Sequence, residues 1–164
     1  MFSSFYTLPK MLLLEEELVN FRQQKKNVVL VTGVFDLLHQ EHKTFLQKAK
    51  AAGDILIVGI ESDVRVRKIK GEGRPVQREQ TRLSVIQKLS YVDEAFILPE
   101  SFLSPQNHED LIAFIKPHIL AISSHSDHQD EKRALVEKYG GSLQIVHEHN
   151  PNISTTRNLS SVVQ

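Results

Sequence analysis

The chain has 164 residues, of which 40% are hydrophobic and 24% charged, and its 20 lysines and arginines balance its 20 aspartates and glutamates. This composition is typical of one globular domain, and a net charge of zero excludes a general attraction to nucleic acid or to an anionic membrane. The absence of cysteine excludes disulfides, thiolate nucleophiles and cysteine-ligated metals. No apolar run approaches the ~20 residues that cross a bilayer. From the run lengths and the balanced charge together, we expect a cytoplasmic protein without nucleic-acid or membrane partners.

The first predicted element is a helix near the N-terminus. Apolar residues recur at spacings of three and four from Met11 to Phe21, which is the pattern of a helix with one face on a core. The three glutamates at 15–17 are expected to face water. We therefore interpret residues 1–26 as a helical extension that precedes the main domain at 27–164.

Five short apolar runs follow along the chain, and each is rich in valine, isoleucine or leucine, as in strands that are buried on both faces. The predicted strands are residues 28–31, 55–60, 95–98, 119–122 and 143–146. Segments with helical spacing separate them. This alternation predicts an α/β fold, a Rossmann-like doubly wound sheet of five parallel strands in a single domain. In such sheets, ligands bind at the carboxyl ends of the strands.

Residues 32–42 follow the first predicted strand and enter the next helix, which is where anions bind in such folds. Gly33 allows the backbone to approach a ligand closely. His39 and His42 are three residues apart, so they share one helix face and can both reach one phosphate chain. Imidazoles there can donate hydrogen bonds to oxygens on which charge grows during phosphoryl chemistry. The spacing alone also fits a packed or solvated histidine pair.

This segment resembles the signature of the cytidylyltransferase-like nucleotidyltransferase family, a GxFDxxHxGH turn at the end of the first strand. The matching positions are Gly33, Phe35, Asp36, His39 and His42. Further phrases are most similar to those of the adenylyltransferases of ADP-heptose synthesis, and next to those of glycerol-3-phosphate cytidylyltransferases. These phrases lie at residues 59–63, 65–67, 70–75, 79–82 and 153–156.

The resemblance implies that a nucleoside monophosphate is transferred from ATP to a phosphorylated sugar or polyol, with release of pyrophosphate. CTP stays open as the nucleotide. The expected cofactor is Mg²⁺, and the expected partners are a nucleoside triphosphate and a phosphorylated small-molecule acceptor. A homodimer is a further expectation, because relatives are commonly dimers. In such a reaction the protein orients both reactants and neutralises the developing charge.

The resemblance also assigns roles to individual residues. His39, His42 and Lys70 are the expected catalytic residues, with the histidines on the α- and β-phosphates. The expected nucleotide-binding residues are Gly33, Val34, Phe35, Asp36, Lys68, Arg82, Ser154, Thr155 and Thr156. Asp63, beside the carboxyl end of the second predicted strand, is expected to face the acceptor.

Several of these residues have a second interpretation. Asp36 either positions magnesium or caps the turn. Lys68, Lys70 and Arg82 also fit solvated helix charges, which is the usual state of lysine and arginine. The three hydroxyl residues at 154–156 equally fit an ordinary helix N-cap.

Three positions depart from the family pattern. Glu41 replaces the signature glycine, so we expect weaker phosphate binding unless its carboxylate turns outward or pairs with Lys43 or an arginine. His149 stands where the cytidylyltransferase pattern has an arginine. Residues 123–126 replace the Gly-Asp type turn that contacts nucleotide or acceptor in relatives, which leaves the base and the acceptor open.

Two alternative functions stay open at this point. In the first, Glu41 has removed catalysis, and the chain is a nucleotide-binding module without turnover. In the second, the chain binds zinc or another transition metal through a histidine- and aspartate-rich loop, since imidazole and carboxylate groups suit such ions. The candidate ligands are His125, Asp127, His128, Asp130, His147 and His149.

Overall fold

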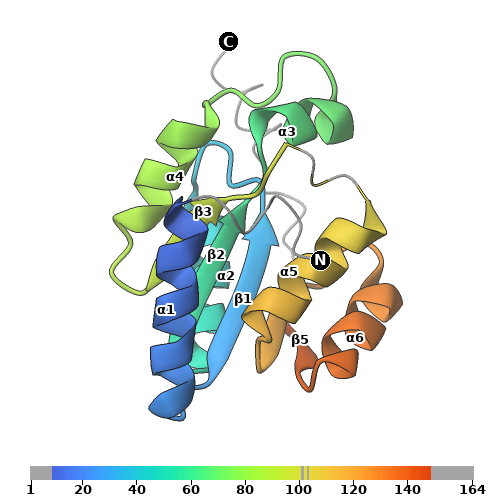
Figure 1. Cartoon of the computed structure of the whole chain (residues 1–164). Helices are drawn as coiled ribbons and strands as arrows, with labels where there is room; N and C mark the ends of the chain where they lie inside the picture. Colours follow the sequence, from blue (N-terminus) through green and yellow to red (C-terminus); the bar gives the residue numbers. More distant parts are fainter. Residues whose placement is uncertain (1–8, 101, 103, 149–164) are drawn as a thin grey trace.

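A parallel sheet of five strands forms the centre of the computed structural model, in the order β3-β2-β1-β4-β5 (Figure 1). The structure describes residues 9–100, 102 and 104–148. The strands are β1 (Val28–Gly33), β2 (Ile55–Ile60), β3 (Glu94–Ile97), β4 (Ile119–Ser123) and β5 (Ser142–His147). Each apolar run of the sequence therefore marks a strand, although the third run extends one residue past the end of β3, and the predicted Rossmann-like α/β fold is confirmed.

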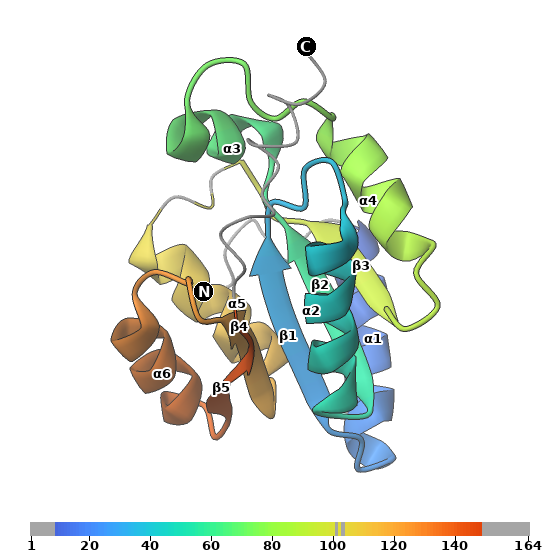
Figure 2. The ribbon, with the colours of Figure 1, turned by 180° about the vertical axis from the view of Figure 1, so that it is seen from behind.

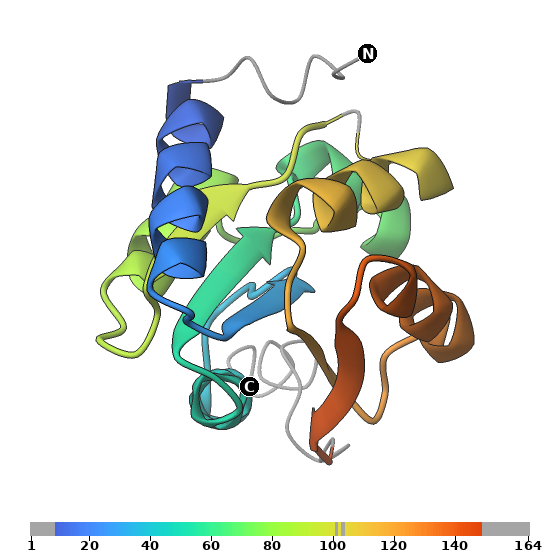
Figure 3. The ribbon, with the colours of Figure 1, turned by 60° about the horizontal axis from the view of Figure 1, so that its bottom comes forward.

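Helices cover both faces of this sheet. The described residues form α1 (Pro9–Gln23), α2 (Gln40–Ala51), α3 (Asp63–Lys70), α4 (Glu79–Gln87), α5 (Pro105–Ile115) and α6 (Gln129–Lys138). Side chains of α1, α5 and α6 join the core on one face, and those of α2 and α4 join the core on the other. α2 lies in front of the sheet in Figure 2 and below it in Figure 3, where α1 and α5 lie above. None of these helices combines the length and apolar character that a membrane crossing requires.

The middle strand, β1, contributes to both cores. Val28 and Leu30 belong to the core under α1 and α5, whereas Val29 and Val31 belong to the core under α2. Because successive strand side chains point to opposite faces, a strand covered on both sides needs an unbroken apolar run. The short apolar runs of the sequence follow from this burial of the strands on both faces.

The N-terminal helix packs as its apolar spacing predicts. Met11, Leu14 and Leu18 are buried in the same core as β1 and α5. The Nζ atom of Lys10 pairs with the carboxylate of Glu94, at the start of β3, at a distance of 2.8 Å. α1 is therefore attached to the sheet both by apolar burial and by an ion pair.

The order of the strands locates a crevice at one edge of the sheet. From β1 the chain continues to β2 and β3 on one side, and it then crosses to β4 and β5 on the other. Sheets of this kind bind ligands outside the carboxyl ends of the strands, where the order reverses. In this chain that place is bounded by the turn from β1 into α2 and by the segment that follows β4.

Candidate functional site

The turn between β1 and α2 has a strained backbone. Phe35 and Leu37 adopt positive φ angles of 51° and 49°, which residues other than glycine rarely do. The Phe35 ring folds back over Gly33, where a Cβ atom would lie 2.8 Å from it. Gly33 is therefore required for this packing. Because strained backbone clusters at ligand sites, the turn itself is a candidate site.

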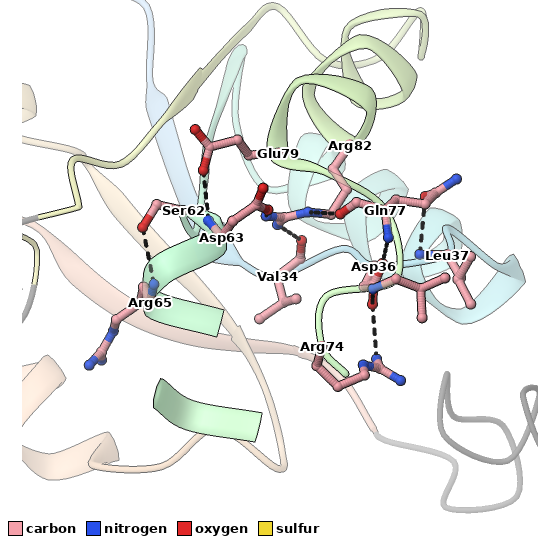
Figure 4. A network of polar contacts seen from close by, with 11 residues as sticks. Val34, Asp36, Leu37, Ser62, Asp63, Arg65, Arg74, Gln77, Glu79 and Arg82 are labelled. Atoms are coloured by element: carbon pink, nitrogen blue, oxygen red, sulfur yellow. Dashed lines mark hydrogen bonds and ion pairs between the residues drawn. The ribbon is translucent and has the colours of Figure 1, made fainter. Parts of the chain in front are cut away.

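Asp36 ties this turn to the loop between α3 and α4. Its buried carboxylate accepts hydrogen bonds from the backbone N–H groups of Val76 at 2.8 Å and Gln77 at 3.0 Å (Figure 4). The guanidinium of Arg74 pairs with the same carboxylate at 3.1 Å. Both oxygens of Asp36 are thus engaged by the protein. The residue therefore fits the interpretation that it holds the turn.

Arg82 lies under the same turn and is only 1% exposed. Its guanidinium donates to the carbonyls of Val34 at 2.6 Å and Gln77 at 3.1 Å, and it pairs with Asp63 at 2.8 Å (Figure 4). The interpretation of Arg82 as a solvated helix charge is therefore wrong, because burial forces its donors onto partners distant in sequence. The Asp63 carboxylate, which was expected to face the acceptor, points to this guanidinium.

His39 and His42 lie together at the start of α2. His39 is the N-cap residue, and the two imidazole rings stack with centroids 3.8 Å apart and planes inclined by 18°. The Phe35 ring meets the His42 ring nearly perpendicularly, with centroids 5.6 Å apart. The pair therefore lies beside the strained turn, at a helix N-terminus whose N–H groups and dipole favour an anion.

His42 is uncharged at neutral pH. Burial, followed by the neighbouring charges of His39 and Lys70, lowers the pKa of His42 to about 3. The Nδ1 atom of His42 faces the backbone N–H of His39 at 3.5 Å, the outer limit of a hydrogen bond. In a neutral imidazole one nitrogen accepts and the other donates, so this contact assigns the proton to Nε2. The ring then offers an Nε2–H donor to a ligand.

The two lysines predicted for the site both belong to α3, and their surroundings differ. Lys68 is exposed, which fits the solvated interpretation. Partial burial and the neighbouring Arg74 lower the pKa of Lys70, against the opposite effect of Asp36. Lys70 also acts on the pKa of His42. Both lysines are exposed, and Lys70 differs in lying near enough to His42 for its charge to act on that ring.

Glu41, in place of the signature glycine, lies in the first turn of α2. Its carboxylate meets Nε2 of His147, at the end of β5, at 2.8 Å. Nδ1 of the same ring meets Nζ of Lys48 at 3.2 Å. The sequence suggests Lys43 or an arginine as the partner of Glu41, whereas the structure supplies a histidine. This contact joins α2 to β5 beside the site.

The histidine- and aspartate-rich segment does not assemble a metal site in the described part of the chain. Among residues 9–100, 102 and 104–148, no three histidine, aspartate or glutamate side chains are placed to share a metal ion. The ring nitrogens of His147 already face Glu41 and Lys48. The metal-binding alternative thus gains no support. Four residues named above lie outside the described residues: His149, Ser154, Thr155 and Thr156.

Sequence reasoning missed the roles of three residues that build the site: Arg74, Gln77 and His147. Gln77 connects to the turn twice, since its N–H donates to Asp36 and its side-chain oxygen accepts from the Leu37 N–H at 3.3 Å. The signal for Arg74 was its place within the family-like phrase at 70–75. His147 was named from the sequence only as a candidate metal ligand, and its place after the fifth apolar run is the signal that it lies at this edge of the sheet.

Comparisons with known proteins identify a matching family and several relatives. A family model described as cytidylyltransferase-like matches residues 30–159. The chain is 43% identical over 124 residues to a bifunctional protein HldE from Pelobacter propionicus, covering 74% of this chain and 24% of the relative. It is 32% identical over 150 residues to a bifunctional protein HldE from Desulfatibacillum aliphaticivorans, covering 91% and 29%. The chain thus spans about a quarter of the length of these relatives.

Solved structures show the same architecture. The lipopolysaccharide core biosynthesis protein from Thermoplasma volcanium is 27% identical with a TM-score of 0.62, and the match covers 76% of this chain and 97% of that chain. A pantoate-beta-alanine ligase from Francisella tularensis is 16% identical with a TM-score of 0.56, covering 89% and 70%. At that identity the second match shows a shared fold alone.

Proposed function

Because the chain belongs to the cytidylyltransferase-like family, we propose that it transfers a nucleoside monophosphate from a magnesium-bound nucleoside triphosphate to a phosphorylated sugar or polyol, releasing pyrophosphate. The relatives named bifunctional protein HldE agree with the resemblance to the adenylyltransferases of ADP-heptose synthesis, which favours ATP over CTP. The observation that carries the proposal is the stacked pair of His39 and His42 beside the β1–α2 turn.

In the proposed reaction an oxygen of the acceptor phosphate attacks the α-phosphorus. The bond from this phosphorus to the oxygen that bridges to the β-phosphate breaks, and pyrophosphate leaves with that oxygen. Charge grows on the α- and β-phosphate oxygens. The neutral ring of His42 can donate from Nε2, and Lys70 adds a positive charge nearby. Removing one such preorganised donor typically costs about 10²–10³ in kcat.

The second contribution of the protein is to hold the turn in place. Arg82 donates a hydrogen bond to the Val34 carbonyl of the turn. Asp36 binds the loop that carries Arg74 and Gln77. These groups are buried, so their geometry is fixed before a ligand arrives. A small misplacement of reacting groups can cost about 10²-fold in rate, which gives this support a catalytic value.

Magnesium is proposed to enter with the nucleotide, as part of the substrate. Mg²⁺ is commonly held by substrate phosphates and water with few protein carboxylates. The engagement of Asp36 by Arg74 and two backbone N–H groups suits this arrangement. The bound ion would neutralise phosphate charge, and the residues around the turn would orient the phosphates.

Pyrophosphate release tests the proposal. ATP and CTP, each with magnesium, are offered with a panel of sugar and polyol phosphates. At least one pair should release pyrophosphate, and His39→Ala and His42→Ala should each lower turnover about 100-fold or more. Gln47→Ala, an exposed change on the same helix, is the matched control and should keep the wild-type rate. Equal rates in all variants would overturn the role given to the histidines.

A second candidate function is nucleotide binding without turnover, and Glu41 favours it. Its carboxylate lies in the first turn of α2, where a phosphate is expected, and it would repel that phosphate. The same panel separates the two candidates. Nucleotide binding by calorimetry, with no pyrophosphate from any pair, would identify the binding module.

A further inference from the structure

A second group of charged side chains lies outside the carboxyl end of β2, away from the histidines. We call Glu61, Arg65, His108 and Lys132 the Glu61 cluster. They come from the end of β2 and from α3, α5 and α6, which lie along one side of the molecule in Figure 1. The Glu61 N–H donates to the Gly33 carbonyl at 2.9 Å. The cluster therefore begins one strand away from the proposed phosphate-binding turn.

The centre of the cluster is an incomplete ion pair. Arg65 Nε lies 3.6 Å from Glu61 Oε2, which is too long for a hydrogen bond. Both atoms are buried, and neither has a hydrogen-bond partner among the described residues. Unsatisfied buried polar atoms are costly and rare in folded proteins, so such a pair requires an explanation. Part of each side chain stays exposed, 25% for Arg65 and 11% for Glu61, so the cluster borders solvent although these two atoms are themselves buried.

The other two members surround this pair with further polar groups. Lys132 Nζ donates to Ser126 Oγ at 2.6 Å, and the His108 ring packs against Phe102 with centroids 4.4 Å apart. Burial, then the nearby charges of Arg65, Lys132 and His128, lower the pKa of His108. Burial raises the pKa of Glu61, while Arg65 and Lys132 oppose that rise.

The charge balance of the region indicates which ligand it suits. Two cations, Arg65 and Lys132, are offset by Glu61 and by Asp127 and Glu131, both of which act on Lys132. The cluster is therefore not a strongly positive site for a second phosphate. It instead offers donors and a carboxylate acceptor side by side. A hydroxyl group can donate to a carboxylate and accept from a guanidinium at once, which neither a carbonyl nor an ammonium can do.

We propose that the Glu61 cluster binds the hydroxyl groups of a sugar or polyol phosphate, with a hydroxyl completing the contact between Glu61 and Arg65. The inference rests on the proposed function for the location of the reacting phosphate, which extends from the cluster toward the β1–α2 turn. Arg65 points away from the Asp36–Arg74 pair in Figure 4, so α3 presents separate side chains to the two regions. The cluster thereby selects hydroxylated acceptors.

Binding calorimetry with the whole protein tests this assignment. The probes are glycerol 3-phosphate, ribose 5-phosphate and glucose 1-phosphate, with propyl phosphate as the hydroxyl-free reference. At least one hydroxylated probe should bind about tenfold or more tightly than propyl phosphate. Glu61→Gln, Arg65→Gln and Lys132→Gln should each remove most of this preference, whereas Arg67→Gln, an exposed change on α3, should keep it. Magnesium-bound ATP or CTP should bind all variants equally.

The outcomes separate this inference from the proposed function. Pyrophosphate release with unchanged acceptor KM in folded Arg65→Gln and Lys132→Gln proteins would overturn the role proposed for the Glu61 cluster. The proposed nucleotidyl transfer would stand. Hydroxyl-dependent binding that these variants lose, without pyrophosphate from any pair, would keep the cluster and overturn the function. The absence of a hydroxyl preference in the wild-type protein would overturn the cluster directly. Thermal melting of each variant establishes that it is folded.

Discussion

The imidazole rings of His39 and His42 stack face to face, with their centroids 3.8 Å apart. Burial and this neighbouring ring keep His42 uncharged, with its pKa lowered from 6.5 to about 3. A neutral ring at a helix N-terminus costs less to bury than a charged one, and it still donates one hydrogen bond. The lowered pKa of His42 makes the free energy of unfolding depend on pH.

His42 should make the protein less stable as the pH falls below 6.5. In the unfolded chain His42 takes up a proton near pH 6.5, whereas in the folded protein it resists protonation down to about pH 3. The unfolded state therefore binds more protons in this window, and stability falls with pH by up to about 1.4 kcal/mol per pH unit. Urea unfolding at pH 6.5 and 5.5 should show a larger loss for the wild type than for His42→Asn. Equal losses would contradict the lowered pKa.

Replacement of Arg82 should destabilise the fold strongly. Arg82→Met removes the bonds to Val34 and Gln77 and leaves Asp63 without its buried partner. Loss of one partner of a buried pair costs about 3–5 kcal/mol, and the partial exposure of Asp63 places the expected loss near the lower end. Arg78→Met, at an exposed N-cap, should change the free energy of unfolding by less than about 0.5 kcal/mol. Similar losses in both variants would contradict the supporting role.

Asp36→Asn should loosen the loop beside the turn. The amide oxygen can keep one backbone hydrogen bond, but the second bond and the charge opposite Arg74 are lost. Hydrogen exchange at the Val76 and Gln77 amides should become about tenfold faster, which corresponds to roughly 1.4 kcal/mol. Amides of β5 serve as the internal reference and should not change. Unchanged exchange at Val76 and Gln77 would show that Asp36 does not hold the loop.

Glu41→Gln should tighten the binding of a nucleoside triphosphate. The change removes one negative charge from the first turn of α2 and keeps a side chain that can still meet His147. The repulsion removed is on the order of 1 kcal/mol, or about fivefold in affinity, and it should shrink as salt is added. Calorimetry measures the effect, with Glu16→Gln on α1 as the exposed control. Equal affinity in the two variants would place the Glu41 carboxylate away from the phosphates.

The fold follows from the sequence because burial on both faces leaves a clear pattern. The run at 55–60 matches β2 over its whole length, and the run at 28–31 ends two residues before β1 does. Those two residues, Thr32 and Gly33, are polar or small, so an apolar count stops early although the backbone pairing continues. The start of α5 likewise has a local cause, because the hydroxyl of its N-cap residue Ser104 accepts from the Asn107 N–H.

Only part of the site could be predicted from the sequence, and the reason is physical. The histidine pair depends on neighbours three residues apart, and helix geometry determines that contact. The partners of Asp36 and Glu41 lie 40 and 106 residues away, so they depend on how loops and strands meet in space. Arg82 shows the consequence. Helical spacing suggests a solvated charge, whereas the tertiary structure buries its guanidinium beneath Val34.

The most direct test of phosphate binding at the turn is the response of the two imidazoles to a nucleotide. Nitrogen NMR of histidine side chains can follow each ring while magnesium-bound ATP or CTP is added. The ring signals of His39 and His42 should shift and saturate together with binding measured by calorimetry. His118, which accepts from Val28 at the opposite end of β1, should stay unchanged. Saturated nucleotide binding without any shift of the His39 and His42 rings would contradict their role.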